Sequence, residues 1–295
     1  MKKLLFPLAI LGMFFFASCG GGDDTDPKED EGSGVDAELE AKLASVPDDR
    51  VALYMKSSGT LCPPCGGWGW NVHTQVIEEA GANIAPLTIH SANFVSKDFI
   101  NEEGNKLDAD MGINSWPSYI VSSGAGGKLQ KAALNFSGAT EASLKADVIS
   151  EVETAIADQE VKAGAAVKWS VANNEITVDV RTRFFEEMPE GEYFLSVYVD
   201  ESLVQAPQSG HPDGSPFHKH VLRTAMDGHS VYGIQLNTDG GAIAKDQLFE
   251  TTHTAEFPEG AWDKDNCVVT AVVWTVSGTI SKAYAVLNAS QATFE

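Results

Sequence analysis

The chain has 295 residues, and its 20 lysine and arginine residues against 42 aspartate and glutamate residues give a formal net charge of −22 at pH 7. This balance argues against a nucleic-acid binder, which needs clustered basic side chains for phosphate contacts, and against docking on anionic lipid through a basic patch. A hydrophobic content of 43% is ordinary for a folded chain, and the single long apolar run, at the N-terminus, excludes a polytopic membrane protein.

The first 18 residues predict a secretory signal peptide. Lys2 and Lys3 precede an apolar stretch from Leu4 to Phe16, and two small residues lead into Cys19. A cysteine at this place resembles the lipidated cysteine of bacterial lipoproteins, which implies that a lipid on Cys19 is the chain's only attachment to a membrane. The alternative is an ordinary secreted protein in which Cys19 is incidental.

Residues 19–35 are predicted to form a flexible tether. The segment is rich in glycine and acidic residues and has almost no apolar side chains, so it cannot bury enough surface to order itself. An acidic stretch just after the lipidated cysteine resembles the surface-export signal of Bacteroidota lipoproteins. It implies an outer-membrane location, on the periplasmic or the outward face, whereas the alternative is a plain solvated linker.

Between residues 36 and 160 the pattern predicts an α/β domain with mixed parallel and antiparallel strands. Short apolar strands alternate with helices, and the last helix has apolar residues spaced by fours. In chain order, the expected elements are a helix at 36–46, a strand at 51–55, a helix at 66–80, a strand at 84–91, a partly helical stretch at 98–111, strands at 117–122 and 129–135, and a helix at 140–157.

After Asp158 the pattern becomes alternating, which predicts a second domain over residues 161–295 with the boundary near 158–164. Asn173 and Asn174 separate two alternating runs and predict a hairpin. Several strands with turn clusters between them, and no long helical pattern, predict an all-β sandwich. Besides the hairpin, strands are expected at 192–200, 219–225, 247–256 and 267–275.

The motif with the clearest chemistry is Cys62-Pro63-Pro64-Cys65, which lies between a predicted strand and a predicted helix. At a helix start, unpaired N–H groups and the helix dipole stabilise a thiolate, so the pKa of the Cys62 thiol is expected to fall from ~8.5 toward the reactive range. Cys65, one turn later, is within reach to resolve a mixed disulfide. The sequence therefore predicts a redox-active Cys62–Cys65 pair.

Two other interpretations of the pair stay open. A static disulfide or a relic is compatible with an exported compartment, although so short a loop adds little entropic stabilisation. A metal site is the other, with His73 and His90 joining the pair, but a single Cys-x-x-Cys motif is weak for zinc. We therefore expect no metal and no cofactor.

Around this motif the chain resembles the thioredoxin-like fold. The resemblance rests on the Cys pair, on the run from Met111 to Pro117, and on the last helix, which begins at Thr140. It implies that Pro117 is a cis-proline facing the Cys pair. It also implies that the backbone at Trp116 and Pro117 binds an extended substrate peptide by strand addition.

The chain departs from the thioredoxin-like pattern near the motif. Leu61 replaces the usual tryptophan before the first cysteine, and Lys56 stands where many relatives carry a buried acid. A lysine there is expected to lower the thiolate pKa further while removing the usual base. Gly66, Gly67 and Gly69 weaken the start of the helix, because glycine costs ~1 kcal/mol relative to alanine.

The whole layout resembles the outer membrane 28-kDa-related lipoprotein family of Bacteroidota. A lipoprotein signal is followed by a thioredoxin-like stretch and by a β-rich half that ends in CVVTAVVW and AYAVLNASQA. The resemblance spans nearly the whole mature chain. It implies an outer-membrane location, a thioredoxin-like N-terminal domain and an immunoglobulin-like C-terminal domain, but no particular activity.

The other candidate residues have structural interpretations. Cys267 begins an apolar strand and is expected to be a buried free thiol. Trp68 and Trp70 are expected either to line a peptide groove or to cover the fold. The remaining histidines are interpreted as solvated helix, loop or strand-edge residues: His73, His211, His218 and His220.

Two functions from different classes fit the sequence. The first is an enzyme, a thiol-disulfide oxidoreductase acting on the thiols of exported proteins or peptides, in which Cys62 exchanges and Cys65 resolves. Trp116 and Pro117 would position its substrate. The second is a non-catalytic surface lipoprotein, an adhesion or complex subunit on an inherited fold, and it is motivated by the missing acid at Lys56.

Overall fold

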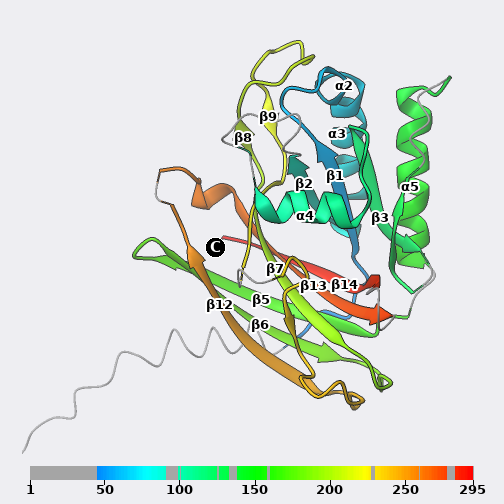
Figure 1. The fold of residues 1–295 in the computed structure, drawn as a ribbon, viewed down its shortest axis with the longest axis vertical. Helices are drawn as coiled ribbons and strands as arrows, with labels where there is room; N and C mark the ends of the chain where they lie inside the picture. Colours follow the sequence, from blue (N-terminus) through cyan, green and yellow to red (C-terminus); the bar gives the residue numbers. More distant parts are fainter. Residues whose placement is uncertain are drawn as a thin grey trace, which may run out of the picture.

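Figure 1 shows the fold in a computed structural model, which describes residues 45–90, 99, 101–124, 126–132, 138–157, 160–226, 230–258, 260–277 and 283–294. The predicted signal peptide and the tether with Cys19 lie outside the described residues, as does the helix expected at 36–46 apart from its last two positions. Within the described ranges, no helix is both long and apolar enough to cross a membrane.

The first half of the described chain alternates strands and helices, as the pattern predicts. Its elements are β1 (Ala52–Ser58), α2 (Pro63–Gly66), α3 (Trp68–Ala80), η1 (Gly81–Asn83), β2 (Ile84–His90), α4 (Glu102–Asp110), β3 (Ser118–Gly124), β4 (Lys128–Lys131) and α5 (Glu141–Ala157).

These strands form a mixed sheet with helices on both faces. β1 is parallel to β2 and antiparallel to β3, and β3 is antiparallel to β4. Tyr54 of β1 packs in one core with Val72 of α3 and Val148 of α5. Met55, the next residue, points to the other face and packs with Leu107 of α4. Because both faces are covered, β1 is buried along its whole length.

The regular secondary structure in the second half of the described chain is almost entirely strand. Its elements are β5 (Ala163–Ala172), β6 (Glu175–Phe184), β7 (Tyr193–Glu201), β8 (Val204–Gln205), β9 (Phe217–His218), β10 (Val221–Ala225), β11 (Ile234–Gln235), β12 (Leu248–Glu256), η4 (Lys264–Asn266), β13 (Cys267–Ser277) and β14 (Ala283–Thr293).

Two layers of strands enclose the core of this half (Figure 1). One layer is the three-stranded sheet β12-β6-β5, and the other contains β14, β13 and β7. Val178 of β6, Val197 of β7 and Val269 of β13 meet in one hydrophobic core. The predicted hairpin joins β5 to β6, and Asn173 and Asn174 have φ of 52° and 60°, the left-handed values that such a two-residue turn requires.

The two halves share a sheet. The nine-stranded sheet has the order β10-β2-β1-β3-β4-β14-β13-β7-β11, and β10 also pairs with β7. Strands of the second half therefore extend the first sheet at both edges, through the pairs Ala285–Lys128 and Val221–Thr88. The molecule is a mostly-β protein with a mixed sheet and a smaller number of helices.

The helix expected at 66–80 differs from the structure, which has two helices there. α2 ends at Gly66 and α3 begins at Trp68, with Gly67 between them at φ −88° and ψ −117°. This ψ lies outside the helical region, so the chain changes direction immediately after the Cys motif.

Candidate redox site

Cys62 and Cys65 form a disulfide, with their Cα atoms 5.3 Å apart. Cys62 is the N-cap residue of α2, and the Cys65 N–H donates to the Cys62 carbonyl oxygen at 3.1 Å. The two prolines between them occupy the first helical positions, where the missing N–H groups would have had no helical partner. The Cys65 side chain is fully buried, whereas Cys62 is 5% exposed, so Cys62 is the sulfur nearer to solvent.

The loop before β3 lies against this disulfide. The peptide bond between Trp116 and Pro117 is cis, as the resemblance implies. Cys62 Sγ lies 3.7 Å from the Trp116 carbonyl oxygen. The Pro117 ring packs on α3 at Gly69, where an added Cβ would lie only 2.5 Å from Pro117 Cγ. The fold therefore brings Cys62, Trp116 and Pro117 together.

Lys56 is buried on β1 beneath α3. Its Nζ atom lies 5.4 Å from the centre of the Trp70 ring. Burial lowers the pKa of the Lys56 ammonium from 10.5 to about 7, because the charged form loses its hydration. Near neutral pH a substantial fraction of Lys56 is therefore uncharged, which weakens the effect on the thiolate that the sequence suggested.

Asp108 on α4 is a buried acid that sequence reasoning missed. Ser57 Oγ donates a hydrogen bond to Asp108 Oδ2 at 2.8 Å. Burial raises the pKa of the Asp108 carboxyl to about 6, although hydrogen bonds from Ser57 and Trp116 oppose this rise. Ser57 and Lys56 point to opposite faces of the sheet, so Asp108 lies on the face opposite Lys56 and near the Trp116 loop. No periodic signal marks it, because α4 is polar along most of its length.

The histidines are more buried than the sequence suggested. The expectation of a solvated His73 is wrong, since its ring is buried between the Tyr54 hydroxyl, 3.0 Å from Nδ1, and the Thr88 hydroxyl, 3.2 Å from Nε2. His218 is likewise buried rather than at an exposed edge, and desolvation lowers its pKa to about 4. His220 Nδ1 lies 2.8 Å from Asp200 Oδ2.

Three further expectations concern a metal, the tryptophans and Cys267. Among the described residues there is no group of three or more His, Cys, Asp and Glu side chains suited to hold a metal ion. Trp70 packs against two histidines of the second half, since its ring centre lies 4.8 Å from that of His211 and 5.1 Å from that of His218. Cys267 is buried and unpaired as predicted, and burial raises its pKa to about 12.

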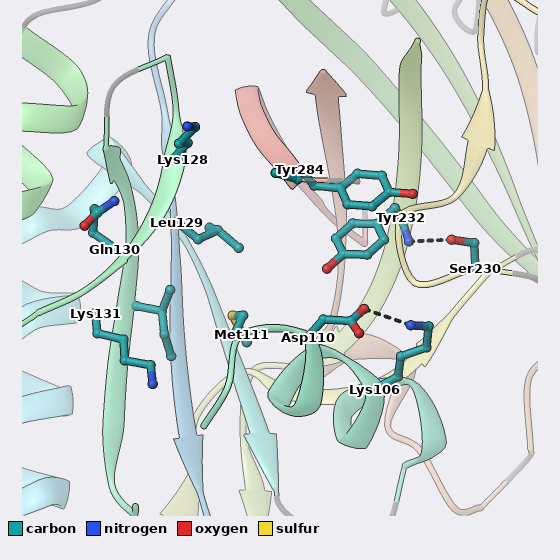
Figure 2. A pocket seen from close by; sticks show the side chains of 12 residues that line it. Lys106, Asp110, Met111, Lys128, Leu129, Gln130, Lys131, Ser230, Tyr232 and Tyr284 are labelled. Carbon is teal, nitrogen blue, oxygen red and sulfur yellow. Dashed lines mark hydrogen bonds and ion pairs between the residues drawn. The ribbon is translucent and has the colours of Figure 1, made fainter. Parts of the chain in front are cut away.

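A separate cavity of about 680 Å³ opens where β4 and β14 pair at a single position (Figure 2). Tyr232 and Tyr284 stack there with ring centres 3.5 Å apart, and Lys106 pairs with Asp110 at 2.8 Å. The described residues that line this cavity include no cysteine or histidine. The cysteine pair therefore lies outside this cavity.

Comparisons with known proteins support the fold. No family model matches the chain, and no curated protein sequence matches it. HBP35 of Porphyromonas gingivalis is similar in structure, with a TM-score of 0.62 and 17% identity over 84% of this chain and 76% of that one. At this identity the likeness shows a shared fold alone.

A weaker structural likeness involves a domain of the outer membrane lipoprotein Omp28 from Porphyromonas gingivalis. Its TM-score is 0.30 with 15% identity, over 46% of this chain and 89% of that domain. This similarity is too low to carry an argument about the fold.

Proposed function

We propose that this chain is a lipid-anchored lipoprotein of the outer membrane that exchanges disulfides with the thiols of exported proteins or peptides through Cys62 and Cys65. The observation that carries the proposal is the disulfide at the start of α2, with Cys62 Sγ 3.7 Å from the Trp116 carbonyl oxygen beside Pro117. The helix contribution to a thiolate at Cys62 is smaller than the sequence suggested, because α2 has four residues and begins with two prolines, which carry no N–H group.

The proposed exchange begins when a substrate thiolate attacks Cys62 Sγ. The Cys62–Cys65 bond breaks, and Cys65 leaves as a thiolate. A second substrate thiolate then attacks the substrate sulfur of the mixed disulfide and releases Cys62 as a thiolate. The substrate dithiol has then lost two electrons to the Cys pair, and the reverse sequence reduces a substrate disulfide.

The surface beside Cys62 is suited to an extended apolar segment. Leu61 is 58% exposed, and Pro63 and Pro64 are also exposed. On the other side of the sulfur is the Trp116–Pro117 backbone, where we propose that the substrate peptide binds. Leu61 replaces the usual tryptophan without removing an apolar side chain from this position.

We further infer a thioredoxin-like domain over residues 36–160 and an immunoglobulin-like sandwich over 161–295. The strand order β2-β1-β3-β4, with α3 and α5 on one face, supports the first. The packing of β12-β6-β5 on β7 and β13 supports the second. Membership of the Omp28-related lipoprotein family of Bacteroidota is part of this proposal.

The decisive experiment compares single cysteine variants. Cys65→Ala should trap a stable mixed disulfide with a disulfide-bonded peptide, because the Cys62 thiolate displaces one peptide sulfur as a thiolate and no resolving sulfur is left to release the other, whereas Cys62→Ala should trap none. Both variants should lose insulin-disulfide reduction by at least about 100-fold. Cys267→Ala, which removes a buried thiol away from the site, should keep wild-type activity. Unchanged reduction in Cys62→Ala would contradict the proposal.

A non-catalytic surface lipoprotein is the second candidate. It is favoured by the low exposure of Cys62, which is 5%, and by a segment of the second half that lies against the motif. Thiol trapping in intact cells separates the candidates. A pair that stays fully oxidised under all growth conditions supports the non-catalytic lipoprotein. A pair whose redox state changes with the growth conditions supports disulfide exchange.

A further inference from the structure

The segment between β8 and β9, residues 206–216, lies directly on the Cys motif (Figure 1). The Ser209 N–H donates to the Thr60 carbonyl oxygen at 2.8 Å. Gly210 has φ +83°, and an added Cβ would lie 2.2 Å from the Pro63 carbonyl oxygen. An added Cβ on Gly66 would lie 2.2 Å from the Ser209 carbonyl oxygen. The two backbones are therefore in contact, with no room for a side chain between them.

Gln208 is the side chain of this segment that reaches the motif. It is 4% exposed. Its Nε2 donates to the carbonyl oxygens of Gly59 and Cys62, both at 3.2 Å, although Cys62 lies 146 residues away in the sequence. The Ser209 carbonyl oxygen, at 3.1 Å, is the third acceptor of the same group. An amide surrounded by carbonyl oxygens must present its NH₂ group to them, so its orientation is fixed.

The Gln208 amide changes the electrostatic environment of the Cys62 sulfur. Two carbonyl oxygens, those of Gly59 and Cys62, bring negative charge density next to this residue, and the N–H groups of Gln208 neutralise part of it. In a buried site such contributions are large, because the local dielectric is low. The disulfide is neutral, whereas the proposed exchange produces a thiolate at Cys62, and an amide that offsets nearby negative charge density stabilises such a reduced form more than the oxidised form.

We propose that Gln208 is a positioning residue of the redox site, which holds the Cys62 carbonyl and shifts the equilibrium of the pair toward the reduced form. The inference rests on the proposed function, since it assumes that the pair exchanges. In this proposal a residue of the second half of the molecule adjusts the redox equilibrium of the cysteine pair in the first half. Gln208 itself touches no reacting atom and acts through the Cys62 backbone.

The test is the equilibrium of the pair with glutathione, in which two glutathione thiols reduce the disulfide and form one oxidised glutathione. It uses the full mature chain with Cys19→Ser, and the reduced fraction is measured by alkylation and mass spectrometry. Gln208→Met keeps the length of the side chain but removes the donor. It should shift the equilibrium about tenfold toward the disulfide, which is about 30 mV for a two-electron couple.

The control is Gln205→Met, in the adjoining strand β8. The Gln205 side chain is exposed, and its amide donates to the Ser215 carbonyl oxygen at 3.4 Å, away from the motif. This variant should leave the glutathione equilibrium unchanged. A second readout is the ultraviolet absorbance of the thiolate against pH, which should show a higher pKa for Cys62 in Gln208→Met than in wild type. A purely structural role would lower stability without moving either quantity.

The outcomes separate the inference from the proposed function. If the wild-type pair equilibrates with glutathione and Gln208→Met has the same equilibrium constant, the inference is wrong and the function stands. If the wild-type pair never exchanges, both are wrong. If Gln208→Met does not fold, Gln208→Asn decides by the same measurement, because its amide is one methylene too short to reach both carbonyl oxygens.

Discussion

Burial changes the charge that Lys56 carries near neutral pH. Its position six residues before Cys62 suggested a permanent positive charge near the thiolate. In the fold the side chain is 2% exposed, and desolvation brings the pKa of its ammonium to about 7. In the unfolded chain the pKa is near 10.5. Lys56 therefore destabilises the fold wherever it must be protonated, and this cost is greatest below about pH 7.

Replacing Lys56 by methionine tests this effect. Because the folded-state pKa is lowered from 10.5 to about 7, stability is lost as the pH falls from the first value to the second, and the loss levels off below about pH 7. Lys56→Met should therefore raise the free energy of unfolding by about 5 kcal/mol at about pH 6, and this gain should shrink toward about pH 10. Urea denaturation of both proteins across this range measures the difference.

The matched control for Lys56 is Lys106→Met. Lys106 is exposed and forms an i,i+4 ion pair with Asp110 at 2.8 Å, an arrangement that contributes little to stability. The Lys106→Met substitution should change the free energy of unfolding only slightly at every pH. A gain for Lys56→Met that does not depend on pH would show that the lysine is not the titrating group.

The reactive residues were visible in the sequence, whereas their partners were not. Cys62, Cys65 and Pro117 belong to short motifs with a mechanism, so local spacing identified them. Asp108 reaches the site through Ser57 and Trp116, and Gln208 through backbone carbonyls of a distant segment. Such contacts depend on tertiary packing, which no local pattern encodes.

At the scale of elements, the start of the Cys helix differs most from expectation. Gly66 and Gly69 were interpreted as weak helix formers. In the fold they are the points where other segments approach, Ser209 at Gly66 and Pro117 at Gly69. Their low helix propensity is the cost of bringing the segment between β8 and β9 and the loop before β3 onto the Cys motif.

A substitution at Gly66 separates propensity from packing. Alanine is the better helix former by ~1 kcal/mol. Its Cβ would nevertheless lie 2.2 Å from the Ser209 carbonyl oxygen, so the segment 206–216 would have to move. Gly66→Ala should therefore lower the free energy of unfolding by about 2 kcal/mol, as measured by urea denaturation.

Gly191→Ala serves as its control. An added Cβ there meets its nearest atom at 3.7 Å, an ordinary contact distance. This variant should stay close to wild type. Equal stability of Gly66→Ala and wild type would mean that the β8–β9 segment is not held against the motif.

Local rules predicted the elements better than their pairing. The hairpin between β5 and β6 followed from Asn173-Asn174, because two consecutive left-handed residues are favoured there. The junctions of the two halves consist of one residue pair each, Ala285–Lys128 and Val221–Thr88. Pairings this short and this distant in sequence leave no periodic signal.

At the scale of the whole molecule, the proposal places the folded part at the end of a tether that begins at Cys19. Cys19→Ala should abolish labelling by a palmitate analogue and remove the protein from the membrane fraction, because no lipid can then be attached. Cys267→Ala should keep both the palmitate labelling and the membrane association, since Cys267 is a buried thiol of the folded part. A Cys19→Ala protein that still fractionates with membranes would contradict lipid anchoring at this residue.

The shared sheet has a consequence for contacts between neighbouring molecules. In the nine-stranded sheet, β10 pairs with both β2 and β7. The pairings therefore form a closed circuit in the order β10, β2, β1, β3, β4, β14, β13 and β7. β1, the strand that leads into the disulfide, pairs with β2 on one side and with β3 on the other, so it offers no template for a strand from an adjacent molecule. Neighbouring molecules are thus protected against joining through β1, and under the proposed function a substrate peptide would pair instead with the short stretch of backbone beside Pro117.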